Sequence, residues 1–94
     1  METKHLVISE LRKIFPKLAL DEAKALWSVL INKDITLPNG IRLAGTFRWW
    51  ADVISYVYGY GDYLTFYCEW PDDQSLIGKI HEKLRKAGWE LKDI

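Results

Sequence analysis

The sequence predicts a single two-layer α+β domain, with helices packed on a small mixed or antiparallel sheet in the order ααββαβαβ. First, the 94 residues suffice for one hydrophobic core and leave no room for a second. Second, segments of helical hydrophobic periodicity alternate with segments of strand-like periodicity. Third, ten of the thirteen aromatic residues fall between positions 47 and 70. Because aromatic side chains bury the most surface, we expect that stretch to organise the core.

Two helices are expected first. Apolar residues recur at helical spacing over residues 4–15, where Thr3 can cap the start. Pro16 disfavours helical geometry at the residue before it, so the helix should end there. A second helix is expected over residues 21–32, with Asp21 at its N-terminal end, where a carboxylate meets free backbone amides.

A β-hairpin is predicted over residues 35–43. Its loop, residues 38–40 (Pro-Asn-Gly), fits a type I turn followed by a glycine in the left-handed conformation. This three-residue loop pairs Leu37 with Ile41 and Ile35 with Leu43. The register is favoured because it places all four apolar side chains on one face of the sheet.

A third helix should begin after Thr46 as N-cap and end at Gly59, which adopts the left-handed cap conformation cheaply. Its apolar stripe comprises Phe47, Trp50, Ala51, Ile54, Val57 and Tyr58. On the opposite side the pattern predicts the polar residues Arg48, Asp52 and Ser55.

The remaining elements are a strand, a helix and a final strand. Residues 63–69 alternate as a strand should, and Asp72 or Asp73 can cap a helix that reaches residue 87. Gly88 ends this helix, and residues 89–92 alternate as an edge strand. A helix between two strands also allows a parallel pair through a right-handed crossover.

Composition excludes several classes of protein. Thirteen basic and thirteen acidic residues balance, so no net field draws the chain to DNA or to an anionic membrane. No run of eighteen apolar residues is present, and the charged N-terminal segment does not match a signal peptide. Cys68 is the only cysteine, so no disulfide within the chain is expected and a reducing, cytoplasmic location is favoured.

Catalytic and metal chemistry have few candidate residues. The two histidines, His5 and His81, have no second ligand at metal-binding spacing, and no phosphate-binding loop is present. Cys68 lies on the apolar side of its predicted strand, where a thiol behaves as a small hydrophobic side chain. We therefore expect no enzymatic activity, no metal and no cofactor.

The leading hypothesis is a small module that binds another protein. Trp and Tyr are enriched at binding hot spots, and a second aromatic stripe lies about 100° round the third helix from the buried one. The expected interface comprises Trp49, Val53, Tyr56, Tyr60, Tyr63 and Tyr67. The partner is an unidentified protein or a second copy of the chain, paired through an edge strand at 63–69 or 89–92.

Two alternatives remain open. Two helices followed by a hairpin suggest a winged nucleic-acid-binding domain, whose basic surface would comprise Arg12, Lys13, Lys17, Lys24 and Arg42. Residues 34–76 contain more acidic than basic residues, and this net negative charge disfavours a nucleic-acid stacking platform in the aromatic stretch itself. The other alternative is a small-molecule site or enzyme built on His81, Asp62 and tyrosines.

Parts of residues 7–24 and 84–91 resemble the C-terminal domain of the bacterial ribosomal stalk protein. Residues 7–12 (VISELR) are similar to the family's V-I-x-x-V-R, and residues 18–24 (LALDEAK) to its L-G-L-K-E-A-K. Residues 84–91 (LRKAGWEL) resemble its closing helix, Ala-Gly turn and strand. The chain lacks the family's first strand and carries some forty additional residues between the matching parts.

This resemblance implies a helix-hairpin surface that docks protein partners. The positions that match the family's motifs on that surface are Arg12, Leu20, Glu22 and Lys24.

Overall fold

The computed structural model describes residues 3–31, 33–59 and 73–93. Its elements are α1 (Thr3–Ile14), α2 (Leu20–Leu30), β1 (Lys33–Thr36), β2 (Arg42–Leu43), α3 (Phe47–Tyr58), α4 (Gln74–Lys86) and β3 (Glu90–Asp93). Within these ranges the four helices and the antiparallel sheet confirm the α+β class. The predicted strand at 63–69 lies outside the described residues, as do Cys68 and the parallel pair that this strand was expected to form.

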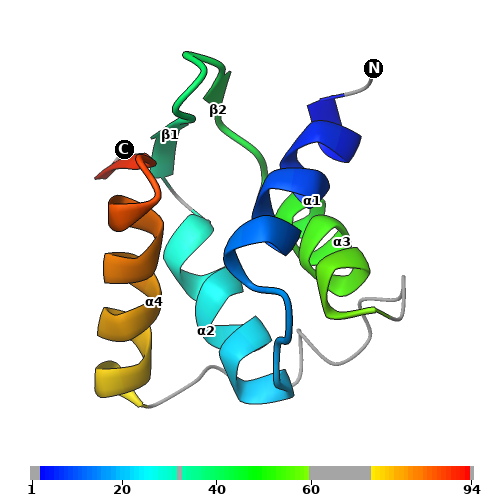
Figure 1. Ribbon diagram of the computed structural model, residues 1–94, viewed down its shortest axis with the longest axis vertical. Coiled ribbons are helices and arrows are strands. Elements are labelled where there is room, and N and C mark those ends of the chain that lie inside the picture. The colour runs from blue at the N-terminus through cyan, green and yellow to red at the C-terminus, as the bar shows by residue number, and fades with distance from the viewer. Residues whose placement is uncertain (1–2, 32, 60–72, 94) are drawn as a thin grey trace.

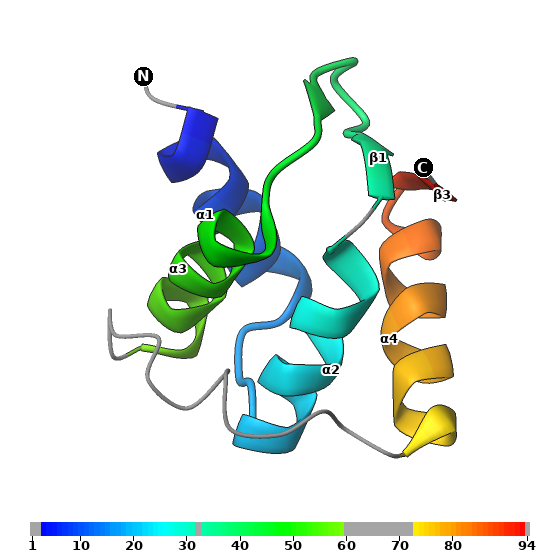
Figure 2. The ribbon, with the colours of Figure 1, turned by 180° about the vertical axis from the view of Figure 1, so that it is seen from behind.

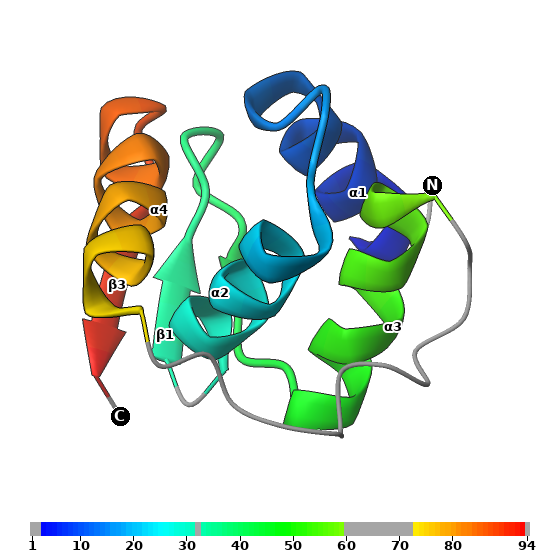
Figure 3. The ribbon, with the colours of Figure 1, turned by 90° about the horizontal axis from the view of Figure 1, so that it is seen from below.

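α2, α3 and α4 form one layer of helices, α1 packs on α3, and the sheet adjoins this layer (Figures 1 and 3). α2 packs against α3 and α4, and α3 also packs against α1. The sheet contacts this layer through β1 on α2 and β3 on α4. Figures 1 and 2 show α1 and α3 together on the side of α2 away from α4, and the view from below in Figure 3 shows β1 and β3 side by side near α4.

The hairpin has the predicted register. Ile35 lies opposite Leu43, and the Leu37 N–H donates to the Ile41 carbonyl oxygen at 2.8 Å. Gly40 has a φ of 90°, as the residue after the type I turn requires. The turn therefore sets the pairing, and the buried face of the hairpin follows from it.

Strand β3 pairs with β1 antiparallel, and cross-strand charges specify its register. Ile35 lies opposite Leu91, while the flanking pairs are Lys33 with Asp93 and Asp34 with Lys92. A slip of one residue in either direction would place two lysines or two aspartates opposite each other. Because like charges directly opposite destabilise a sheet, both slips are disfavoured.

The Lys33–Asp93 pair gives a pH-dependent prediction. The Lys33 Nζ donates to Asp93 Oδ1 at 2.7 Å, and this hydrogen bond, together with the ammonium charge, lowers the pKa of Asp93 below its ordinary value. The ionised carboxylate therefore stabilises the fold above the ordinary pKa, and this contribution is lost as pH falls through the lowered one. In an NMR titration of the Asp93 carboxyl group, Lys33→Met should raise the midpoint toward the ordinary value; an unchanged midpoint would contradict the ion pair.

Side-chain caps fix three helix starts. The Trp49 N–H donates to Thr46 Oγ1 at 3.1 Å, which confirms the predicted cap of α3. At the start of α4, the Leu76 N–H donates to Asp73 Oδ1 at 3.0 Å, which selects Asp73 over Asp72 as the cap. At the start of α2, Asp21 lies in the first turn, as predicted, and the Ala19 N–H donates to Glu22 Oε1 at 3.0 Å.

The end of α4 is a glycine-terminated cap that directs the chain into β3. Gly88 has a φ of 93°, its N–H donates to the Arg85 carbonyl at 3.0 Å, and the Trp89 N–H donates to the Leu84 carbonyl at 3.1 Å. These are the two hydrogen bonds of a Schellman motif. The accompanying hydrophobic contact is provided by Leu84 and Trp89, which are both buried. The chain then enters β3, which pairs antiparallel with β1.

The core is centred on α2 and α3, and residues of α1, α4 and the sheet complete it. Helical spacing predicts one buried face of α2, formed by Ala23, Leu26, Trp27, Leu30 and Ile31, but Ala25 and Val29 are buried as well. The helix lies between α3 and α4, so it buries more than one face. Trp50, Ala51 and Ile54 are fully buried on α3, as expected. None of the described helices has the length and apolar character that a membrane span requires.

Candidate functional site

The predicted second stripe of α3 is divided by burial. Trp49 is half-buried and Tyr56 is 44% exposed, whereas Val53 between them is 0% exposed. Val53 was expected in an exposed patch, and that expectation is wrong. Tyr60, Tyr63 and Tyr67 lie outside the described residues, so the surface that remains is formed by Trp49 and Tyr56.

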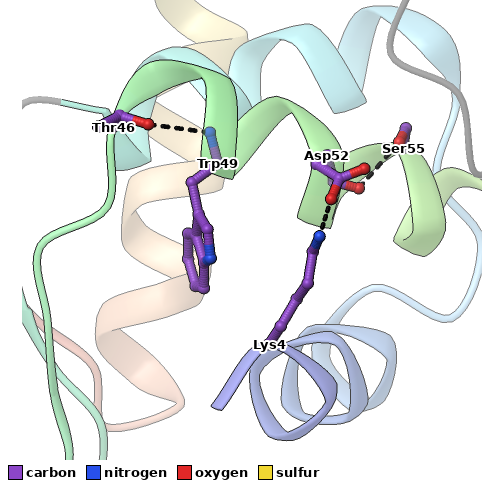
Figure 4. Close-up of polar contacts among 5 residues, drawn as sticks. All are labelled: Lys4, Thr46, Trp49, Asp52 and Ser55. Carbon is purple, nitrogen blue, oxygen red and sulfur yellow. Dashed lines mark hydrogen bonds and ion pairs between the residues drawn. The ribbon is translucent and has the colours of Figure 1, made fainter. Parts of the chain in front are cut away.

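Helix α1 packs against α3, and two contacts place it beside the stripe that contains Val53. Near its N-terminus, the Lys4 ammonium forms an ion pair with Asp52, and near its C-terminus Arg12 Nη2 donates to the Tyr56 carbonyl oxygen at 2.9 Å. Figure 4 shows Trp49 and Asp52 projecting from the same side of α3, with Lys4 reaching Asp52 from α1. The two contacts fix α1 over the middle of the stripe.

The polar side of α3 also differs from the prediction. Ser55 was expected to face outward, but it is 0% exposed. Its hydroxyl donates to the Asp52 carbonyl oxygen at 2.8 Å, one turn earlier in the helix, so the buried oxygen has a partner. Because this bond is internal to the helix, α3 can bury a serine without an acceptor from another element.

Tyr56 borders a hollow between α1 and the last turn of α3. The hollow has a volume of about 520 Å³ and is lined by His5, Ile8, Ser9, Arg12, Lys13 and Tyr56. None of the lining residues is acidic, although Lys13 Nζ lies 3.3 Å from Glu10 Oε1 on the same helix. The Arg12 guanidinium meets the last carbonyls of α3, where a cation complements the helix dipole. The hollow therefore combines an exposed aromatic ring with positive charge.

Trp49 borders two further hollows at the start of α3. One, of about 370 Å³, is lined by Arg42, Leu43, Ala44, Gly45, Thr46 and Trp49. The other, of about 380 Å³, is lined by Thr46, Arg48, Trp49 and Asp52. The Trp49 ring meets the Trp50 ring edge-on, with centroids 4.8 Å apart and planes at 85°. Trp50 is thus held in the core, and its ring positions the Trp49 ring at the surface.

The proposed basic surface is also divided. Arg12 and Lys13 line the hollow at Tyr56, whereas Arg42 lines a hollow at Trp49, two helical turns earlier on α3. Lys17 is exposed in the turn after α1, and Lys24 is half-buried on α2. Moreover, α1 packs chiefly against α3 rather than α2, so the first two helices do not form a helix-turn-helix pair.

His5, Ile8 and Ser9 line the Tyr56 hollow but belonged to no predicted binding surface, whereas Arg12 did. His5, Ser9 and Arg12 recur at i, i+4 and i+7, and this pattern marks one outward face of α1. The sequence shows this spacing, but no residue near α1 in the chain indicates that the face lies beside Tyr56, which is 44 residues after Arg12.

No group of three or more histidine, cysteine, aspartate or glutamate side chains is placed to hold a metal ion among the described residues. His81 is half-buried on α4, and the hollows described above are lined by other residues. Asp62, the other charged residue of the small-molecule hypothesis, lies outside the described ranges.

No family model, no curated protein and no solved structure matches this chain. The resemblance to the ribosomal stalk domain therefore stays a prediction. Of its matching positions, Arg12 bonds to Tyr56 and Glu22 caps α2, while Leu20 and Lys24 are half-buried.

Proposed function

We propose that this protein is a non-enzymatic module that binds another protein through α1 and α3, with Tyr56 as the principal anchor and Trp49 as a second contact. The observation that carries the proposal is the exposure of Tyr56. Among the side chains whose burial the structure describes, it is the one large hydrophobic side chain that is exposed, and it lies beside Arg12. Tyrosine, tryptophan and arginine are the residues most enriched at binding hot spots.

The charge of the hollow favours an acidic partner segment. The positively charged Arg12 and Lys13 line the hollow beside Tyr56, and no carboxylate lines it. A partner that inserts an apolar side chain against Tyr56, with Asp or Glu beside it, would complement both features. The proposal includes a reducing, cytoplasmic location, which is expected because the chain has a single cysteine.

Tyr56→Ala is expected to abolish the capture of a specific partner while leaving the fold intact, because the side chain beyond Cβ is largely outside the core. The measurement is affinity capture from an extract of the source cells with quantitative mass spectrometry, followed by calorimetry with the purified partner. Loss of a hot-spot tyrosine should weaken binding by roughly 30-fold or more, which corresponds to about 2 kcal/mol.

The matched variants separate the anchor from general surface effects. Arg12→Ala should weaken the same interaction, whereas Arg85→Ala, an exposed arginine on α4, should not. The proposal is contradicted if no protein is retained specifically, or if Tyr56→Ala retains the same partner as the wild type.

Nucleic-acid binding is the second candidate, because Arg12 and Lys13 lie beside the exposed Tyr56 ring. Basic side chains around an aromatic ring can bind single-stranded nucleic acid by stacking and phosphate contacts. Fluorescence anisotropy with labelled single-stranded and duplex oligonucleotides decides between the two. Affinity that falls steeply with salt supports this candidate, and no binding at low salt excludes it.

A further inference from the structure

Strand β3 has one edge without a partner strand in the described part of the chain. The sheet order is β2-β1-β3, so β3 is hydrogen-bonded to β1 on one side, and its outer backbone groups face away from the sheet. We propose that β3 is a self-association strand: two copies of the chain pair antiparallel through β3, with Leu91 opposite Leu91 of the second copy, and form one continuous six-stranded sheet.

The faces of the sheet restrict the possible registers. Side chains directly opposite each other in an antiparallel pair point to the same face. Leu91 is half-buried on the side of Ile35, whereas Glu90 and Lys92 are exposed. In a twofold pair, Leu91 must therefore lie opposite an odd-numbered residue of the second copy. In the registers shifted by one residue, Leu91 would lie opposite Glu90 or Lys92, which are charged.

Charge then selects one register among those that remain. With Leu91 opposite Leu91, each Glu90 faces Lys92 of the other copy, and the twofold symmetry makes this pair twice. A shift of the second copy by two residues would place either Glu90 opposite Glu90 or Lys92 opposite Lys92. Opposite charges stabilise a cross-strand pair and like charges destabilise it, so β3 is complementary to itself in one register.

The surroundings of β3 also fit a second copy. A hollow of about 350 Å³ adjoins the strand and is lined by Arg85, Trp89, Glu90, Leu91 and Lys92. Leu91 of the second copy would enter beside the half-buried Leu91 there, so apolar contact would accompany the backbone hydrogen bonds. Since a four-residue edge gives an interface below about 1,200 Å², we expect association at concentrations on the order of 100 µM.

Charge reversal tests the register directly. Sedimentation velocity and light scattering should show the wild type dimerising as its concentration rises, and Glu90→Lys and Lys92→Glu should each remain monomeric. An equimolar mixture of the two single variants should form heterodimers, and the double swap Glu90→Lys/Lys92→Glu should restore dimerisation. Such rescue cannot come from a change in stability alone.

Two controls keep the test independent of folding. Lys92 also faces Asp34 across β1, so Lys92→Glu weakens a pair within the chain, whereas Glu90 faces the neutral Thr36. Circular dichroism melts of each variant report folding, and Lys79→Glu, an equal charge change at an exposed position of α4, should dimerise like the wild type. A wild type that stays monomeric at about 1 mM, or single variants that dimerise as well as the wild type, would overturn the proposal.

Discussion

Replacing Trp50 with alanine is expected to lower the free energy of unfolding by about 3–5 kcal/mol, the range for removing a large buried aromatic side chain. Trp50 is 0% exposed in the first turn of α3, and its ring meets the Trp49 ring edge-on. A small domain has a total stability of about 5–15 kcal/mol, so this variant should be largely unfolded at moderate urea concentrations.

Trp49 provides the matched comparison, since it is the adjacent residue of the same helix and only half-buried. Trp49→Ala should lower the free energy of unfolding by about 1–2 kcal/mol, because the side chain is partly buried and its contact with the Trp50 ring is lost. Urea titrations followed by circular dichroism measure both values. Equal losses for the two variants would contradict the placement of Trp50 in the core and Trp49 at its margin.

The Trp50 indole adds a second comparison. Its N–H is buried and has no hydrogen-bond acceptor in the described part of the chain. Trp50→Phe therefore loses ring volume but no hydrogen bond. It should lower the free energy of unfolding by less than Trp50→Ala does. A loss as large as that of the alanine variant would indicate that the N–H is in fact bonded.

Gly45→Ala is expected to destabilise the fold by about 1–3 kcal/mol, the usual cost of forcing extra volume into a packed site. A Cβ atom at this position would lie 2.5 Å from Trp49 Cε3 and 3.1 Å from Trp50 Nε1. The nearest obstacle is the body of an indole ring rather than the tip of a flexible chain. The methyl group must therefore displace Trp49 or shift the start of α3.

Gly78→Ala is the control for that variant. Gly78 is an exposed interior residue of α4, and a Cβ there would meet no atom within 4 Å. Because glycine in a helix interior costs roughly 0.5–1 kcal/mol relative to alanine, this change should stabilise the protein. In thermal melts, the midpoint temperature should fall for Gly45→Ala and rise for Gly78→Ala. The near-ultraviolet circular dichroism signal of the tryptophans should change in Gly45→Ala alone. Two shifts of the same sign would contradict the contact.

Gly45 also ties the hairpin to the proposed binding surface. It lies between β2 and the Thr46 cap, and it lines a hollow with Trp49 and Arg42. A displaced Trp49 ring would change that hollow while the hollow at Tyr56 remained intact, since Tyr56 lies two turns further along α3. The effect of Gly45→Ala on partner affinity would therefore separate the contribution of Trp49 from that of Tyr56.

Several parts of the fold were predictable because their chemistry is local. The type I turn with Gly40 set the register of Ile35 against Leu43, and the caps Thr46 and Asp73 bond to amides three residues away. The glycine cap at Gly88 likewise depends on carbonyls within the same turn of α4. In each case the hydrogen-bonding partners lie within a few residues, so the sequence contains the whole interaction.

The candidate site was only partly predictable. Helical periodicity placed Trp49, Val53 and Tyr56 on one side of α3, but it could not show that α1 packs over Val53. Nor could it show that Arg12 meets Tyr56 while Arg42 meets Trp49. Burial of a side chain is decided by elements distant in sequence, and a periodic pattern does not say which neighbour covers which stripe.

By itself, the sequence determined the α+β class, the hairpin register and the capped starts of α3 and α4, because each follows from backbone hydrogen bonds and capping groups close in the chain. The tertiary structure alone decided that Tyr56 is exposed, that Val53 and Ser55 are buried, and that the basic residues are divided between two hollows. The difference has one physical reason: hydrogen bonds that define an element are short-range in sequence, whereas the removal of a side chain from water depends on how whole elements pack.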